Sequence, residues 1–263
     1  MKVNVVVVQY YASDAELDAL LLRFSRILAQ EDIEPVISRI DIRKSEAVAS
    51  GSLRFFDISA YLDGLSRIGS GEPVVLLNDT LFLKHPWRTY VTSMSRMLRP
   101  IFSLDVPCAG GAALPTQNVV VIDEQNPTRT HVGTFLVALN PSGRALFERL
   151  GSQLPAEEAD LGRRWLQSLV SNNQALSLIL MFLFSKDPHP LRWQDRKAIG
   201  LDESVVQRKK VAIAFEYMLS REVLRSGGLL WPVNGGRRQW LREQSELFVR
   251  KALKVLTLGR LGF

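Results

Sequence analysis

The first candidate for chemistry is an acid that directly follows an apolar segment. Asn78, Asp79 and Thr80 come after residues 73–77 (PVVLL), which read as a buried strand. Ligands of open α/β sheets bind outside the carboxyl ends of the strands, so we expect Asp79 to face a cleft. A carboxylate there can hold Mg²⁺ or Mn²⁺ and so neutralise a diphosphate leaving group. The alternative is that Asp79 caps the segment that follows it.

Two other carboxylates stand in segments that are predicted to be helical. Asp57 lies where a helix is expected to begin, and a helix-dipole or capping role would account for it. Glu216 lies beside the apolar face of the amphipathic segment 214–224. Partial burial could raise the pKa of Glu216 toward that of a general base. The alternative is a solvated or ion-paired glutamate on the surface.

Several other site classes are not supported by the sequence. His131 precedes the strand-like run 132–139, where a lone histidine is usually structural. Because no other histidine or cysteine stands at metal-ligand spacing to it, zinc is not expected. The sequence contains no G-x-S-x-G elbow and no P-loop, and the first strand does not lead into G-x-G-x-x-G.

The elements that would position these residues alternate between strand and helix in the first eighty residues. Strands are predicted over residues 3–11, 34–42 and 73–77. A capping-box pattern, Ser13-Asp14-Ala15-Glu16, opens the first helix, and a second helix with apolar positions from Ile58 to Ile68 stops at residues 69–71. This pattern predicts an α/β fold with a mostly parallel central sheet flanked by helices.

The rest of the chain is predicted to complete one domain and a tail. Helices are expected over residues 86–98, 141–150, 161–184 and 205–225, and short strands over 119–123 and 132–139. We therefore divide the chain into a domain of residues 1–233 and a basic amphipathic helical tail of residues 234–263.

Composition indicates a globular chain in a reducing compartment. With 46% hydrophobic and 23% charged residues, the chain can bury a full core. Cys108, the single cysteine, cannot form an internal disulfide, and the apolar run at the N-terminus is too short for a signal peptide. No stretch reaches the roughly 18 apolar residues of a spanning helix. We expect a cytoplasmic protein.

The positive charge is concentrated in the tail. The last 27 residues hold seven basic and two acidic residues, a net +5 of the total +6. On a helix, the apolar side chains of this segment would lie on one side. The basic side chains, among them Arg242, Arg250, Lys251 and Lys254, would lie around the other side. Such a helix can lie on an anionic membrane, where each cation contributes on the order of 1 kcal/mol. The alternative is a terminal helix docked on the body or on a partner subunit; nucleic acid is not an expected partner.

Four blocks of sequence resemble one family. Residues 57–65 (DISAYLDGL) look like its D-F-G-A-Y-x-x-G-L helix start, and residues 74–82 (VVLLNDTLF) like its L-L-L-N-D-S-x-x strand end. Residues 131–139 (HVGTFLVAL) are similar to its H-x-Q-S-Y-F-L-x-F strand, and residues 215–220 (FEYMLS) to its Y-E-x-x-L-T helix. In this order the blocks resemble the rhamnan-synthesis protein F-like family of bacterial polysaccharide glycosyltransferases, which has the GT-A type, Rossmann-like fold.

The resemblance implies an enzyme that moves a sugar from a nucleotide-diphosphate donor to an envelope polysaccharide or glycolipid, at the inner face of the cytoplasmic membrane. Catalysis would rest on Glu216 as the base of an inverting transfer and on Asp79 near the diphosphate or its metal. The residues that it assigns to donor binding are Gln9, Tyr10, Asp57, Tyr61, Asn78, Asp79, Thr80 and His131.

Departures from the family pattern keep two alternatives open. Leu53 and Phe55 replace an asparagine and a glycine, Ser59 and Gly133 replace a glycine and a glutamine, and Asp79 is one acid where a D-x-D motif has two. A non-catalytic relative that scaffolds polysaccharide assembly is one alternative. A nucleotide-dependent enzyme of unrelated chemistry is the other.

Overall fold

The structure is a computed structural model that describes residues 1–42, 57–115, 130–154, 159–171, 176–177, 180–181, 184, 203–234 and 241–249. Its strands are β1 (Lys2–Gln9), β2 (Glu34–Asp41), β3 (Val74–Asn78), β4 (Cys108–Pro115), β5 (Thr130–Leu139) and β6 (Leu229–Pro232). Its helices are α1 (Asp14–Ala29), α3 (Asp57–Ser66), α4 (Thr80–Lys84), α5 (Trp87–Phe102), α6 (Pro141–Ser152), α7 (Ala159–Ser171) and α9 (Glu203–Arg225), and residues 241–249 are also helical.

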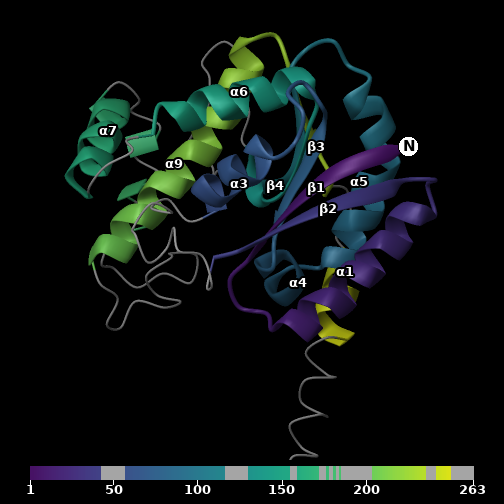
Figure 1. The fold of residues 1–263 in the computed structure, drawn as a ribbon. Coiled ribbons are helices and arrows are strands. Elements are labelled where there is room, and N and C mark those ends of the chain that lie inside the picture. Colours follow the sequence, from purple (N-terminus) through teal and green to yellow (C-terminus); the bar gives the residue numbers. More distant parts are fainter. Residues whose placement is uncertain are drawn as a thin grey trace, which may run out of the picture.

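The six described strands form one sheet in the order β2-β1-β3-β5-β4-β6 (Figure 1). β1 pairs in parallel with β2 and β3, and β4 pairs in parallel with β6. β5 runs antiparallel to both of its neighbours, β3 and β4. The predicted mostly parallel α/β sheet is therefore confirmed, with β5 as the reversed strand among those described.

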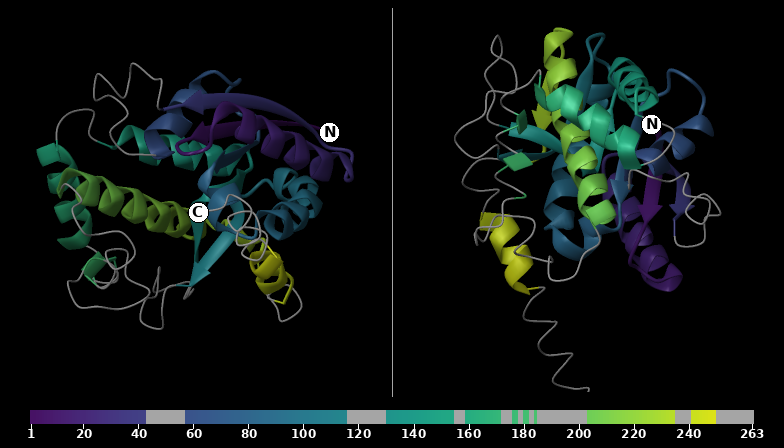
Figure 2. Two further views of the ribbon diagram at one scale, coloured as in Figure 1. Left: turned by 90° about the horizontal axis from the view of Figure 1, so that it is seen from below. Right: turned by 90° about the vertical axis from the view of Figure 1, so that its left-hand side faces the viewer.

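Helices cover both faces of this sheet (Figure 2). Val3, Val5 and Val7 of β1 belong to a core that includes side chains of α1 and α5. Val6 and Val8 point the other way, into a core shared with α3, α6 and α9. Because successive side chains of a strand alternate between faces, a strand buried on both faces needs the continuous apolar run that β1 has.

Most predicted elements are confirmed at nearly the expected bounds. The strands predicted over 3–11, 34–42, 73–77 and 132–139 correspond to β1, β2, β3 and β5. Ser13 is the N-cap of α1 with a complete capping box, in which Ser13 and Glu16 bond to each other's backbone N–H. Asp57 is the first residue of α3, and α9 ends at Arg225 as expected.

Three described elements are not predicted by the sequence, namely α4, β4 and β6. β4 contains Gly110 and Gly111, and such small residues give no strand pattern. Packing requires them, because an added Cβ would lie 2.3 Å from Cδ1 of Ile101 at Gly110 and 2.4 Å from the Leu136 carbonyl oxygen at Gly111. The predicted strand over 119–123 lies outside the described residues. Of the helix predicted over 161–184, α7 covers the part to Ser171, and the described residues 176–177, 180–181 and 184 are helical as well.

The described ranges include no helix that is both long and apolar enough to cross a membrane. Of the tail, residue 234 and residues 241–249 are described, so Arg242 lies within the described part. Arg250, Lys251 and Lys254 lie outside it.

Candidate functional site

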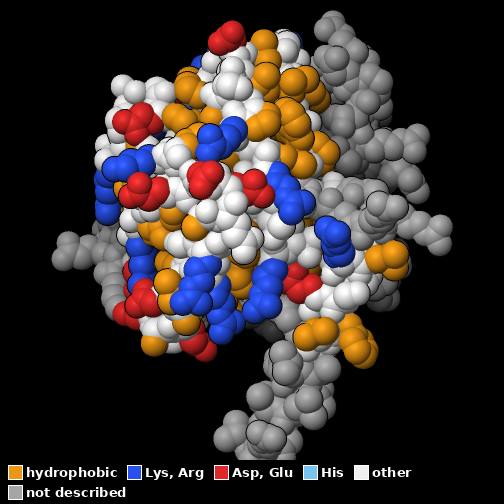
Figure 3. Space-filling model, turned by 90° about the vertical axis from the view of Figure 1, so that its right-hand side faces the viewer, with side chains coloured by type: hydrophobic (Ala, Val, Ile, Leu, Met, Phe, Trp, Pro, Cys, Tyr) orange, Lys and Arg blue, Asp and Glu red, His pale blue; other side chains and the backbone are white. Residues whose placement is uncertain are grey.

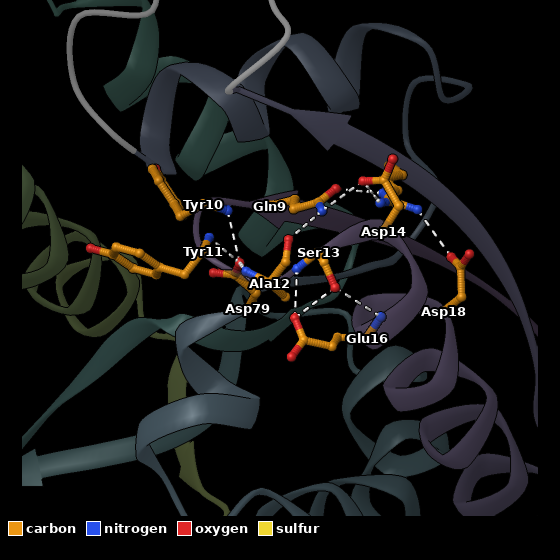
Figure 4. Close-up of polar contacts among 10 residues, drawn as sticks. Gln9, Tyr10, Tyr11, Ala12, Ser13, Asp14, Glu16, Asp18 and Asp79 are labelled. Atoms are coloured by element: carbon orange, nitrogen blue, oxygen red, sulfur yellow. Dashed lines mark hydrogen bonds and ion pairs between the residues drawn. The ribbon is translucent and has the colours of Figure 1, made fainter. Parts of the chain in front are cut away.

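The candidate site lies where the direction of sheet growth reverses. From β1 the chain adds β2 on one side and then returns to add β3 on the other. Such a switch point opens a crevice outside the carboxyl ends of the two central strands, here β1 and β3. Residues of the β1–α1 loop and Asp79 meet at this point (Figure 4).

The carboxylate of Asp79 joins the two strand ends. Its Oδ2 accepts hydrogen bonds from the backbone N–H groups of Tyr10, Tyr11 and Ala12, at 2.9, 2.5 and 2.8 Å. Hydrogen bonds to an ionised acceptor are roughly twice as strong as those between neutral groups. Asp79 therefore fixes the path of the chain from β1 into α1.

The other oxygen of Asp79 has a different environment. Oδ1 is buried and accepts no hydrogen bond from any described residue. Asp79 is the N-cap residue of α4, but its side chain does not cap that helix. The expectation that Asp79 lies open to a cleft is not met, because its side chain is fully buried under the β1–α1 loop. One unpartnered oxygen nevertheless remains at the switch point.

Gln9 is committed to a hydrogen-bond network on the opposite side of the same loop. Its Nε2 donates to the carbonyl of Ala12 at 2.6 Å and to Oδ1 of Asp14 at 3.1 Å. Its Oε1 accepts from Nε of Arg39 at 2.7 Å, and Arg39 also pairs with Asp14 and Asp18. Gln9 therefore lies at the carboxyl edge of the sheet, as predicted. Its amide, however, is engaged in hydrogen bonds that hold the β1–α1 loop.

Asn78 and Thr80 flank Asp79 as predicted. Asn78 is buried at the end of β3, and its Oδ1 accepts a hydrogen bond from the Thr80 hydroxyl. Tyr10 is half-buried, and its ring lies 5.9 Å from that of Tyr11, measured between centroids. These side chains meet at the ends of β1 and β3, where the sequence predicts the donor site.

An aromatic side chain and a cation at this edge were not predicted. Tyr11 is 59% exposed, and its ring points away from Asp79 (Figure 4). The Lys84 ammonium lies 4.8 Å from the centroid of that ring. An exposed ring can stack on a nucleobase and a nearby cation can attract a phosphate. Lys84 belongs to α4, and because α4 itself was not predicted, no sequence pattern indicated this pair.

Glu216 reaches the same edge from α9. β3 pairs with Leu136–Leu139 of β5, so the first part of β5 extends beyond the end of β3. There Oε1 of Glu216 accepts from the Thr134 N–H at 2.8 Å and from the Thr134 hydroxyl at 2.7 Å. Ser220, one helical turn later, accepts from the N–H of Val132 at 3.1 Å. Side chains of α9 therefore accept the hydrogen bonds from β5 that a neighbouring strand would otherwise accept.

The second oxygen of Glu216 has a different environment. Oε2 makes no hydrogen bond to a described residue and lies 3.8 Å from Nε2 of His131. Burial lowers the pKa of His131 to about 3, so this imidazole is neutral and the contact is not an ion pair. Sequence reasoning did not identify Thr134 as the residue that fixes Glu216.

His131 is held by stacking. Its ring lies against that of Tyr217, with centroids 4.1 Å apart, and its Nδ1 has no hydrogen-bond partner within the described ranges. Burial, followed by the charge of Glu216, raises the pKa of the Tyr217 hydroxyl, which therefore stays protonated. Two of the described side chains near Glu216 are thus uncharged rings.

Tyr61 connects this group to the core of the sheet. It is fully buried in α3, and its hydroxyl donates to the carbonyl of Thr134 at 2.8 Å. Its ring contacts Phe147 edge to face. Tyr61 lies near the predicted site, but the role the structure shows for it is structural. The side chain of Asp57 lies outside the described part.

The N-terminus of α1 is poorly suited to bind phosphate. Helix N-termini attract anions when their N–H groups are available. Here the N–H groups of Ser13 and Glu16 are taken by the capping box, and Asp14 adds a second acid to the first turn. The hydrogen bond to the Ser13 side chain lowers the pKa of Glu16, so its charge persists. A diphosphate at this edge would be bound elsewhere, nearer to Lys84 and Asp79.

A divalent cation is compatible with the switch point through one ligand. The described residues contain no group of three or more histidine, cysteine, aspartate or glutamate side chains that could hold a metal ion. Oδ1 of Asp79 is a buried carboxylate oxygen without a partner there. Mg²⁺ commonly takes one or two carboxylates and completes its shell with substrate phosphates and water. A carboxylate oxygen suits such a cation chemically, but because Oδ1 is fully buried a diphosphate-bound cation reaches it only if the β1–α1 loop moves.

Comparison with known proteins adds no family or relative. No protein-family model, no curated protein and no solved structure matches this chain.

Proposed function

We propose that this protein is a glycosyltransferase that moves a sugar from a nucleotide-diphosphate donor to a bacterial envelope polysaccharide or glycolipid. The observation that carries the proposal is the arrangement of two carboxylates at one edge of the sheet, of which Asp79 is buried and Glu216 partly buried. Oδ2 of Asp79 accepts from three backbone N–H groups, and Oε1 of Glu216 accepts from the N–H and the hydroxyl of Thr134. Oδ1 of Asp79 has no described partner, and Oε2 of Glu216 lies 3.8 Å from Nε2 of His131. The resemblance of four sequence blocks to the rhamnan-synthesis protein F-like family, with its GT-A type fold, supports the same activity.

On the donor side, the proposal assigns the diphosphate to the switch point between β1 and β3. Oδ1 of Asp79 would hold Mg²⁺ or Mn²⁺, whose charge would neutralise the departing diphosphate. Lys84 would contribute a second positive charge, and the exposed ring of Tyr11 would stack on the base. Asn78 and Thr80 complete the donor side at the end of β3.

On the acceptor side, the proposal assigns proton transfer to Glu216. Oε2 takes the proton of the acceptor hydroxyl while the hydroxyl oxygen bonds to the anomeric carbon of the donor sugar. The bond from that carbon to the diphosphate oxygen breaks, and its electron pair leaves with the diphosphate. The two bonds from Thr134 fix the carboxylate, so that Oε2 has a defined direction.

A second candidate function is a non-catalytic scaffold in envelope-polysaccharide assembly. The observation that favours it is the burial of Asp79, whose three hydrogen bonds to the β1–α1 loop would by themselves explain an acid at this position. A scaffold keeps this fold but has no need of a nucleotide.

The first experiment is a thermal-shift panel of UDP, GDP, dTDP and CDP, each with and without Mg²⁺ or Mn²⁺. A ligand at 100 times its dissociation constant stabilises a fold by roughly 2.7 kcal/mol. We expect a metal-dependent shift with one nucleotide. Asp79→Asn should remove the metal dependence, because the amide can still accept the loop hydrogen bonds but places an NH₂ group where Oδ1 was. Asp63→Asn, at an exposed residue of α3, is the matched control.

Transfer is tested separately with Glu216→Gln. The glutamine oxygen can still accept from Thr134, so nucleotide binding should stay at the wild-type level while release of nucleoside diphosphate falls by at least about 100-fold. Glu222→Gln, on the same helix, should leave both measurements unchanged. A flat nucleotide panel on folded protein would instead favour the scaffold.

A further inference from the structure

Glu246 attaches the tail helix, residues 241–249, to the body. Glu246 accepts hydrogen bonds from the N–H of Arg88 at 3.1 Å, the N–H of Thr89 at 3.0 Å and the Thr89 hydroxyl at 3.0 Å. These N–H groups belong to the first turn of α5, and the N-cap residue of that helix, Pro86, supplies no side-chain cap. Glu246 thus performs a capping function from 158 residues away.

This attachment fixes the tail helix at the edge that carries the candidate site. α5 begins just after α4, which itself follows the end of β3. Burial raises the pKa of Tyr90 in α5 to about 12, with further contributions from Glu243 and Glu246. In Figure 1 α4 and the yellow helix both lie at the lower end of the molecule. The helix therefore stands at the rim of the candidate site.

The face of this helix that points away from the body exposes three large apolar side chains, Leu241, Phe248 and Val249, together with Arg242, Gln244 and Ser245. Glu243, Glu246 and Leu247 are partly buried and follow helical spacing, so they define the attached face. Leu241 and Phe248 lie opposite, seven residues apart, and are 51% and 73% exposed. Hydrophobic side chains project from the lower part of Figure 3 at the height of this helix.

Charge identifies the partner that this face fits. Arg242 is exposed beside the apolar stripe, and residues 250–263 contain Arg250, Lys251, Lys254 and Arg260 without any acid. At the same edge Leu83 is 45% exposed and Lys84 is also exposed. Large apolar side chains with basic neighbours match a surface that offers hydrocarbon beneath negative charge, which is an anionic bilayer.

We propose that helix 241–249 lies on an anionic lipid bilayer and that Glu246 holds it so that the candidate site opens onto that bilayer. The acceptor would then be presented from the lipid surface, as a lipid-linked glycan is. This last point rests on the proposed glycosyltransferase function, whereas the docking itself does not.

Binding is tested with full-length protein and lipid vesicles, without nucleotide. We expect sedimentation with vesicles of phosphatidylcholine and phosphatidylglycerol in equal amounts, and none with phosphatidylcholine alone. Phe248→Asp should weaken binding by at least about tenfold, since burying a phenylalanine side chain is worth roughly 1.5–3 kcal/mol. Leu229→Asp is the matched control, because Leu229 is 47% exposed at the opposite edge of the sheet.

Orientation is tested with a polarity-sensitive dye on a single introduced cysteine. Cys108 does not compete for the label, because it is buried and its pKa is raised to about 11. A dye on Leu83→Cys should shift to shorter wavelength on mixed vesicles, and a dye on Leu229→Cys should not. Adding Glu246→Ala should abolish the shift at position 83 while vesicle binding persists.

Other results would overturn the proposal. Absence of binding to anionic vesicles, or wild-type binding by Phe248→Asp, would exclude the helix as the docking surface. Binding without a dye shift at position 83 would mean that the tail is a tether and does not orient the site, and a shift that survives Glu246→Ala would remove Glu246 from the mechanism. None of these results bears on the nucleotide panel, which uses no lipid, so docking and glycosyl transfer can fail independently.

Discussion

Asp79 divides its two oxygens between structure and candidate chemistry. Three consecutive N–H groups converge on Oδ2, while Oδ1 has no described partner. A buried N–H group that loses its acceptor costs about 1–3 kcal/mol. The contribution of Asp79 to stability is therefore large. A variant that deletes the whole side chain would lose stability as well as any function, so the two effects could not be separated.

We predict that Asp79→Ala lowers the free energy of unfolding by about 3–5 kcal/mol, because three N–H groups of the β1–α1 loop lose their acceptor. Asp79→Asn should lose less than half of that amount. Urea unfolding followed by circular dichroism measures both. Equal losses for the two variants would show that charge, not hydrogen bonding, holds the loop.

The sequence predicts which residues gather at the site better than it predicts what they do there. Asn78, Asp79 and Thr80 follow a strand end, and that position alone brings them to the carboxyl edge. The bonds of Gln9 to Arg39 and of Glu216 to Thr134 join residues 30 and 82 positions apart. No local pattern specifies such pairs, because they depend on how strands and helices pack.

At the scale of elements, a buried arginine ties α6 to the end of α3. Arg144 donates to the carbonyls of Leu65 and Ile68 through Nη2, and to those of Gly69 and Glu72 through Nη1. Its Nε donates to Glu148. The last carbonyls of a helix have no partner within the helix, so a cation there satisfies them and favours the helix dipole.

We predict that Arg144→Ala lowers the free energy of unfolding by about 3–5 kcal/mol, because it removes a buried guanidinium together with its hydrogen bonds to four carbonyls and to Glu148. Arg144→Lys should recover only part of this stability. A lysine ammonium is a single point of donation, whereas Nη1 and Nη2 of the guanidinium each donate to a different pair of carbonyls. Arg149→Ala, at an exposed position of the same helix, should change stability by less than about 0.5 kcal/mol. Chemical denaturation of the three variants gives the comparison.

Elements with strong side-chain patterns were predictable and those without were not. β1 and α1 carry a β-branched run and a capping box, which are local signals. The sequence of β4 is set by tertiary packing, since Ile101 and Leu136 leave no room for a Cβ at its two glycines. β6 has four residues, and among the described strands it pairs only with β4, so its sequence is too short to show a strand pattern.

At the scale of the whole molecule, the tail and the body are one hydrogen-bonded unit through Glu246. We predict that Glu246→Ala lowers the free energy of unfolding by about 0.5–2 kcal/mol, the usual effect of losing an N-terminal cap. For a chain of this size that corresponds to a drop in Tm of about 2–4 °C per kcal/mol. Gln244→Ala, on the exposed side of the same helix, should leave Tm unchanged; scanning calorimetry tests both.

The distance in sequence between Glu246 and α5 also sets an order in time. A chain is synthesised at about 5–20 residues per second, so 158 residues take roughly 8–30 s. β1, β2 and β3 are synthesised before α5. β5, which pairs with β3, is synthesised after α5, and the glutamate that caps α5 is synthesised later still. On a translating ribosome the nucleotide half of the proposed site is therefore built first, and the segment that would face the lipid joins it last.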